Sequence, residues 1–121
     1  MLVNLIREGL GRIIAAVSVL TQGKPMARSQ EQQAQVTAAC KNLSLYQFYA
    51  CPFCIKVRRQ MHQLNLPIEF RDIKKNLEFR SELAENGGRV KVPCLRIEEN
   101  GDVQWMYESN DIIAYLQQRF G

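Results

Sequence analysis

Two cysteines separated by two residues form the most reactive pattern in the sequence, Cys51-Pro52-Phe53-Cys54. Such a pair can exchange with a disulfide, or it can provide half of a metal site. A run rich in aromatic and apolar residues, 44–48, precedes the pair and predicts a short strand. Apolar residues recur at helical spacing over 57–64. The pair is therefore expected at a strand-to-helix junction, with Pro52 at or near the first helical position, where its missing N–H costs nothing.

This placement favours thiolate chemistry. Only the thiolate attacks a disulfide, and an ordinary cysteine, with a pKa of about 8.5, is mostly protonated at neutral pH. The unpaired N–H groups and the positive dipole end of a helix N-terminus stabilise the anion. We expect Cys51 to be the nucleophile and Cys54, one turn later, to resolve the mixed disulfide. Lys56 and Arg58 are assigned no role, because exposed cations on a helix are usually solvated.

A zinc site is the other use of such a pair. Four-coordinate zinc needs further ligands, and the candidates His62, Cys40 and Cys94 stand at spacings that match no common zinc finger. The sequence therefore favours redox chemistry, and no metal is expected. Cys40 is interpreted as incidental. Cys94 is interpreted either as a small buried side chain or as a third redox-active thiol.

The elements that must position the pair alternate between strands and helices. After the helix of the pair, the pattern predicts a strand at 68–72, a helix at 76–85, strands at 94–97 and 103–107 around an Asn-Gly turn, and a helix at 109–120. From residue 44 the order is βαβαββα. This order indicates an α/β domain over residues 42–121.

Residues 1–41 differ from the rest and predict an N-terminal helical extension. They carry five basic and two acidic residues, so +3 of the net charge of +4 lies there. The nearly neutral remainder argues against a nucleic-acid groove. Apolar residues at helical spacing predict an amphipathic helix over about 2–20. Residues 29–41 open with an N-cap at Ser29 and predict a solvated linker helix.

Three interpretations of the helix at 2–20 stay open. It docks peripherally on a membrane or a partner, it packs on its own domain, or it is a signal peptide or a membrane span. A span needs about 20 apolar residues, and the longest apolar run here, 13–20, falls well short of that and contains Ser18. No small-x-small cleavage motif follows Leu20. The chain is expected in the cytoplasm, with membrane association through this helix as an option.

From about residue 43 to residue 120 the sequence resembles the glutaredoxins and shares features with the N-terminal domain of glutathione transferases. Three motifs carry the resemblance in register: the cysteine pair, Val92-Pro93, and Glu108-Ser109-Asn110-Asp111-Ile112-Ile113. The resemblance implies a thioredoxin-like fold with a mixed four-stranded sheet. It implies glutathione-dependent disulfide reduction, with glutathione as co-substrate and disulfide-containing proteins as partners.

The resemblance also implies roles for single residues. Pro93 is expected to be a cis-proline facing the active site, and the backbone of Val92 to pair with the cysteinyl part of glutathione. Glu108 and Ser109 are expected to hold the γ-glutamyl end, where a helix N-terminus offers N–H groups to a carboxylate. Phe53, inside the cysteine motif, is counted among the glutathione-binding residues.

One position departs from the glutaredoxin pattern. Many glutaredoxins have Lys or Arg three residues before the first cysteine to bind the glycyl carboxylate of glutathione, and Phe48 stands here. Two other functions stay open, and Phe48 motivates the second of them. One is a [2Fe–2S] carrier in which two protomers each supply Cys51 and a glutathione thiolate, although Pro52 and Cys54 weigh against it. The other is a non-catalytic adaptor held at a membrane or partner by residues 2–20.

Overall fold

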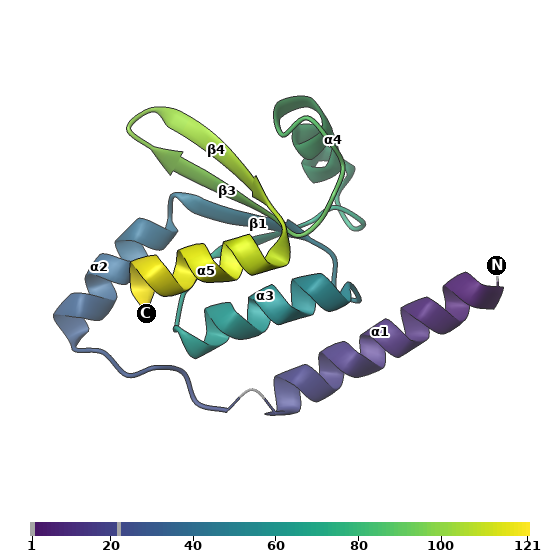
Figure 1. Cartoon of the computed structure of the whole chain (residues 1–121), viewed down its shortest axis with the longest axis horizontal. Helices are drawn as coiled ribbons and strands as arrows, with labels where there is room; N and C mark the ends of the chain where they lie inside the picture. Colours follow the sequence, from purple (N-terminus) through teal and green to yellow (C-terminus); the bar gives the residue numbers. More distant parts are fainter. Residues whose placement is uncertain (1, 22) are drawn as a thin grey trace.

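The computed structural model describes residues 2–21 and 23–121, and the side chains of residues 6–17 and 23–121 (Figure 1). The elements along the chain are α1 (Leu2–Thr21), α2 (Gln30–Cys40), β1 (Leu43–Gln47), α3 (Pro52–Gln63), β2 (Glu69–Asp72), α4 (Leu77–Asn86), β3 (Cys94–Glu99), β4 (Asp102–Tyr107) and α5 (Ser109–Phe120). The order from β1 onward confirms the predicted βαβαββα arrangement.

The four strands form one mixed sheet in the order β2-β1-β3-β4. β1 pairs parallel with β2 and antiparallel with β3, and β3 pairs antiparallel with β4. The parallel pair is connected by α3, which packs beside α5 on one face of the sheet, whereas α4 lies on the other face (Figure 1). This is the expected thioredoxin-like fold.

Alternation along the strands divides the core into two clusters. Leu45 and Leu95, which are register partners, face α3 and α5. Their neighbours Tyr46 and Cys94 face the opposite way, toward Leu83 of α4. The central strands are therefore buried on both faces, and β1 is buried at every position.

Truncating Leu95 to alanine is expected to lower the free energy of unfolding by about 2–5 kcal/mol, the range for buried leucines that leave a cavity. Leu95 is 0% exposed, whereas Leu77 at the start of α4 is 73% exposed and provides the matched control. Chemical denaturation of Leu95→Ala and Leu77→Ala measures the difference. Equal losses in the two variants would contradict this assignment of the core.

α2 is expected from the sequence to be a solvated linker helix, and in the structure every position of it except Cys40 is at least partly exposed. Ser29 caps it as predicted, with its side chain accepting from the N–H of Gln32. However, Cys40 is buried, and Val36 and Ala39 pack against the larger core cluster. Small and medium apolar side chains are sufficient here because α2 needs to cover only one end of the sheet.

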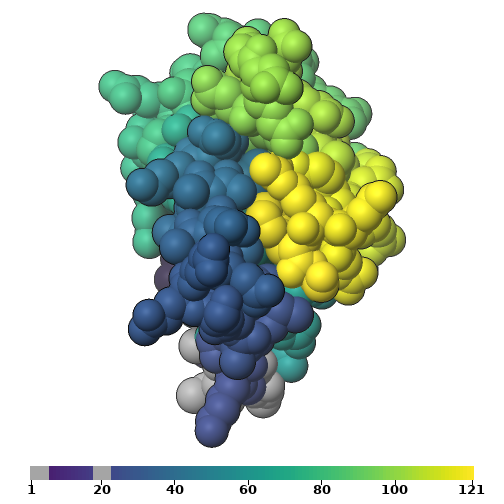
Figure 2. All heavy atoms as spheres, turned by 90° about the vertical axis from the view of Figure 1, so that its left-hand side faces the viewer, coloured from purple at the N-terminus to yellow at the C-terminus, as the bar shows by residue number. Residues whose placement is uncertain are grey.

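Arg28, just before α2, ties this segment to the domain. Its guanidinium donates to the backbone carbonyls of Leu64 at 2.6 Å and Phe120 at 2.7 Å. Figure 2 accordingly shows α2, in blue, against the C-terminal end of α5, in yellow. The C-terminal ends of α3 and α5, which are far apart in sequence, are thus held together because one guanidinium donates to a carbonyl group at each end.

α1 packs on its own domain, which confirms one of the three interpretations of residues 2–20. It runs beside α3 (Figure 1) and contacts the domain through Gly11 and Ala15, both buried. Its outer face carries exposed large apolar side chains, Ile6, Leu10, Ile13 and Ile14. Contact of this face with a membrane or a partner stays a prediction. Within the part of the chain that the structure describes, no helix is long and apolar enough to cross a bilayer.

Candidate active site at the start of α3

Cys51 occupies the N-cap position of α3, with an extended backbone, and Pro52 begins the helix. Its carbonyl accepts from the N–H of Ile55 at 2.9 Å, and its own N–H donates to the carbonyl of Phe48 at 3.3 Å. Cys51 is 6% exposed and Cys54 is fully buried, and both are free thiols. The chain therefore turns sharply at Cys51, and this residue lies at the N-terminus of α3, where the backbone N–H groups are unpaired.

The two thiols have opposite acidities. The thiol of Cys54 donates to the sulfur of Cys51, and the backbone N–H groups of Cys54 and Phe53 add to this. Together they outweigh the burial of Cys51 and lower its pKa to about 6. The same hydrogen bond, with burial, raises the pKa of Cys54 far above its ordinary value. Cys51 is thus the thiolate of the pair at neutral pH, as its position at a helix N-terminus predicts.

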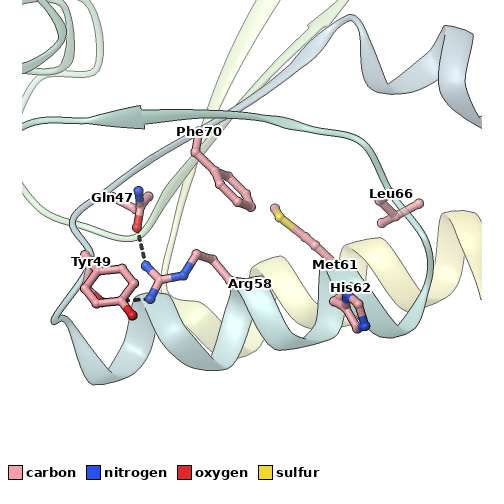
Figure 3. A pocket seen from close by; sticks show the side chains of 7 residues that line it. All are labelled: Gln47, Tyr49, Arg58, Met61, His62, Leu66 and Phe70. Carbon is pink, nitrogen blue, oxygen red and sulfur yellow. Dashed lines mark hydrogen bonds between the residues drawn. The ribbon is translucent and has the colours of Figure 1, made fainter. Parts of the chain in front are cut away.

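Arg58 contributes to this site, although its position in the sequence suggested a solvated side chain. Its guanidinium donates to the side-chain oxygen of Gln47 and to the carbonyls of Phe48 at 3.2 Å and Tyr49 at 2.7 Å. It also lies 5.4 Å from the centroid of the Tyr49 ring. Figure 3 shows Arg58 on the wall of a cavity of about 360 Å³ between α3 and β2. Arg58 therefore fixes the loop that leads into Cys51, and its charge helps to lower the pKa of Cys51.

Replacing Arg58 with methionine, which keeps an apolar stem of similar length, is expected to raise the pKa of Cys51. It should also lower the free energy of unfolding by about 1–3 kcal/mol, because the carbonyls of Phe48 and Tyr49 lose a charged donor. The pH dependence of Cys51 alkylation and chemical denaturation measure the two effects. Arg80→Met, on the exposed surface of α4, is the control. An unchanged pKa of Cys51 would count against the electrostatic part of the argument.

The residues expected to bind glutathione line one cavity of about 260 Å³ beside the motif. Its lining comprises Phe53, Lys91, Val92, Pro93, Glu108, Ser109 and Asn110. The Val92–Pro93 peptide bond is cis, as expected. Every residue predicted for this role therefore borders the same cavity. Lys56, which received no role, donates to Asn110 at 2.6 Å and so links α3 to the start of α5.

Glu108 stands at the N-cap of α5 in a strained conformation, with φ 72°. A non-glycine residue in this region costs free energy and is most often retained at functional sites. Its carboxylate accepts from Lys91 at 2.7 Å, and this contact lowers the pKa of Glu108. Lys91 was not singled out from the sequence, because nothing in its local pattern indicates a partner 17 residues away.

A second and larger cavity, of about 590 Å³, opens directly onto Cys51. Its lining comprises Arg7, Glu8, Phe48, Ala50, Cys51, Pro52, Phe53 and Lys74. The Lys74 ammonium lies 4.2 Å from the centroid of the Phe48 ring. Lys74, from the loop after β2, therefore brings a cation beside Phe48 at the wall of the cavity that Cys51 lines.

Cys40 and Cys94 lie apart from this chemistry. Burial raises the pKa of both thiols, that of Cys94 to about 12, and the Tyr107 hydroxyl lies beside Cys94. This environment favours the interpretation of Cys94 as a small buried side chain. His62 interacts with the carbonyl of Gly23 at 2.9 Å. Among the described residues, no cluster of three or more His, Cys, Asp or Glu side chains is arranged to hold a metal.

Known proteins resemble this chain in sequence and in fold. Prostaglandin E synthase 2 from Mus musculus is 30% identical over 126 residues, which cover 93% of this chain and 32% of that protein. The chain thus spans about a third of the length of this relative.

Two solved structures share the fold. Glutathione transferase E6 from Drosophila melanogaster is 28% identical with a TM-score of 0.52, covering 65% of this chain and 35% of that one. Wheat glutaredoxin is 25% identical with a TM-score of 0.50, covering 76% of this chain and 87% of that one. Residues 45–121 match the family model described as glutathione S-transferase, N-terminal domain, so the chain belongs to this family.

Proposed function

We propose that this chain is a glutathione-dependent thiol–disulfide oxidoreductase that reduces glutathione mixed disulfides and protein disulfides. The observation that carries the proposal is the Cys51 thiol at the N-terminus of α3, with a pKa of about 6 and the Cys54 thiol hydrogen-bonded to it. A thiolate that exists at neutral pH beside a second thiol is equipped for disulfide exchange.

In the first step, the Cys51 thiolate attacks one sulfur of the substrate disulfide. The substrate S–S bond breaks, its other sulfur leaves as a thiolate and takes a proton from water, and Cys51 holds a mixed disulfide. The mixed disulfide is then resolved in one of two ways. In one, a glutathione thiolate attacks the substrate sulfur, forms a disulfide with it and releases Cys51. In the other, Cys54 attacks the sulfur of Cys51, releases the substrate thiol and forms an internal disulfide. Two molecules of glutathione then reduce this disulfide and leave as oxidised glutathione.

Glutathione is proposed to bind in the cavity beside the motif. In this proposal the backbone of Val92, before the cis-proline Pro93, pairs with the cysteinyl part in a strand-like manner. Ser109, at the N-terminus of α5, offers N–H and hydroxyl donors to the γ-glutamyl carboxylate. Glu108 pairs with the γ-glutamyl ammonium by releasing Lys91. The match to the glutathione S-transferase N-terminal family and the likeness to a glutaredoxin support this assignment.

The test is intact-mass analysis of the full chain after treatment with oxidised glutathione, combined with turnover in the presence of glutathione, glutathione reductase and NADPH. The expected result is a glutathione adduct on Cys51 that converts to the Cys51–Cys54 disulfide, together with NADPH consumption that depends on the enzyme. Absence of both the adduct and the turnover would overturn the proposal.

A further inference from the structure

α1 lies against the chain immediately before the nucleophile. Gly11 of α1 packs so closely on Ala50 that a Cβ built on Gly11 would overlap the Ala50 carbonyl oxygen. Ala50 directly precedes Cys51. The close approach is therefore available only to glycine at this position, because any side chain would push α1 away from the backbone.

Further contacts hold α1 in this position. Glu8 forms an ion pair with Lys74 at 3.2 Å, and both residues line the cavity that contains Cys51. Ala15, one turn after Gly11, is buried against the domain. After the helix, Met26 donates its N–H to the carbonyl of Gln63 at 2.9 Å. Contacts on both sides of Gly11 thus make α1 one wall of the space in front of the nucleophile.

The size of this space limits what can reach Cys51. Its volume of about 590 Å³ falls in the range of roughly 300–1,000 Å³ that is usual for small-molecule sites. A folded protein partner usually needs about 800 Å² of contact on each side. Cys51 lines this space together with Arg7 and Glu8 of α1 and is only 6% exposed, so little of it is available to a broad protein surface.

We propose that α1 makes the chain selective for low-molecular-weight disulfides over disulfides on folded proteins, and that Gly11 is the specificity-determining residue. The inference narrows the proposed function and rests on it for turnover. A small disulfide enters, its S–S bond breaks as Cys51 attacks, and one thiol leaves. One glutathione thiolate then displaces the second thiol and leaves Cys51 in a mixed disulfide with glutathione. A second glutathione thiolate attacks the glutathione sulfur of this mixed disulfide and frees Cys51, so that one disulfide and two glutathione molecules yield two thiols and one oxidised glutathione.

The first test needs no glutathione. The full chain reacts with iodoacetamide, which is small, and with a maleimide on a polyethylene glycol chain of about 5 kDa, which is bulky, and mass analysis reads the modification at Cys51. In Gly11→Leu the wedged side chain displaces α1, and the bulky-to-small rate ratio is expected to rise several-fold. Gly9→Leu is the matched control, because among the described residues no atom lies within 4 Å of a Cβ built on Gly9. Both substitutions improve helix propensity alike.

The second test compares kcat/KM for bis(2-hydroxyethyl) disulfide with kcat/KM for a glutathionylated folded protein. The preference for the small substrate is expected to fall in Gly11→Leu and to persist in Gly9→Leu. Circular dichroism checks the fold, and Gly11→Ala, with a smaller wedge, replaces Gly11→Leu if that variant is unfolded. An unchanged alkylation ratio in a folded Gly11 variant, or an equal rise in Gly9→Leu, overturns the inference. A raised bulky-to-small alkylation ratio in Gly11→Leu, in a chain that shows no glutathione-dependent turnover, overturns the proposed function. It still supports the role of α1 in limiting access to Cys51.

Discussion

Replacing Cys51 with serine is expected to abolish glutathione-dependent turnover. A serine hydroxyl stays protonated at neutral pH and cannot form the mixed disulfide, so the first step has no nucleophile. Cys54→Ser is expected to keep turnover of glutathione mixed disulfides, because glutathione itself can resolve the Cys51 adduct. In this second variant the glutathione adduct should accumulate, since the internal disulfide cannot form.

Intact-mass analysis and NADPH-coupled turnover measure both outcomes. Cys94→Ser is the matched control, because its thiol is buried on the other face of the sheet and has a raised pKa. Residual turnover in Cys51→Ser would show that a residue other than Cys51 is the nucleophile. Loss of all turnover in Cys54→Ser would show that the chain works only through the dithiol cycle.

The alkylation rate of Cys51 is expected to rise with pH, to reach half of its maximum near pH 6, and to level off above pH 7. The lowered pKa keeps about 90% of the thiol ionised at pH 7, against about 3% for an ordinary cysteine. The thiolate population is therefore about 30-fold larger than for an unperturbed thiol. A rate that keeps rising up to pH 8 or 9 would contradict the lowered pKa.

The same shift predicts the direction of a stability change. A group whose pKa is lower in the folded state stabilises the fold fully above its unfolded pKa, and the contribution is lost as the pH falls through the folded pKa. The reduced wild-type chain should therefore lose stability relative to Cys51→Ser between about pH 8.5 and about pH 6. Chemical denaturation of both proteins across this interval checks the sign.

Local patterns predicted the elements of this fold because the signals lie within a few residues of each other. Asn76 caps α4 by accepting from the N–H of Glu78, and Ser29 caps α2 in the same way. Gly101 takes the positive φ that the Asn-Gly turn between β3 and β4 requires. The Cys51 environment was also predictable, because a helix N-terminus acts on a thiol within one turn.

Contacts between distant segments were not predictable from these patterns. Lys74 approaches Phe48, and Lys91 approaches Glu108, only after the loops fold back toward α3 and α5. Arg58 looks like any surface cation on a helix until β1 and the following loop surround it with carbonyl groups. Gly11 carries no signal in one sequence, since a glycine inside a helix is locally only unfavourable.

The burial of Cys40 and Cys94 has a consequence for electron counting. Of four free thiols, these two are almost completely shielded and have raised pKa values. We therefore expect the native chain to store a single electron pair, in Cys51 and Cys54, and a redox titration of the folded protein to show one two-electron couple. In the reduced folded chain a thiol reagent should modify Cys51 first, because Cys54 is as fully buried as Cys40 and Cys94 and its pKa is also raised. The other three equivalents should appear only after unfolding, so the thiol count itself reports whether the fold is intact.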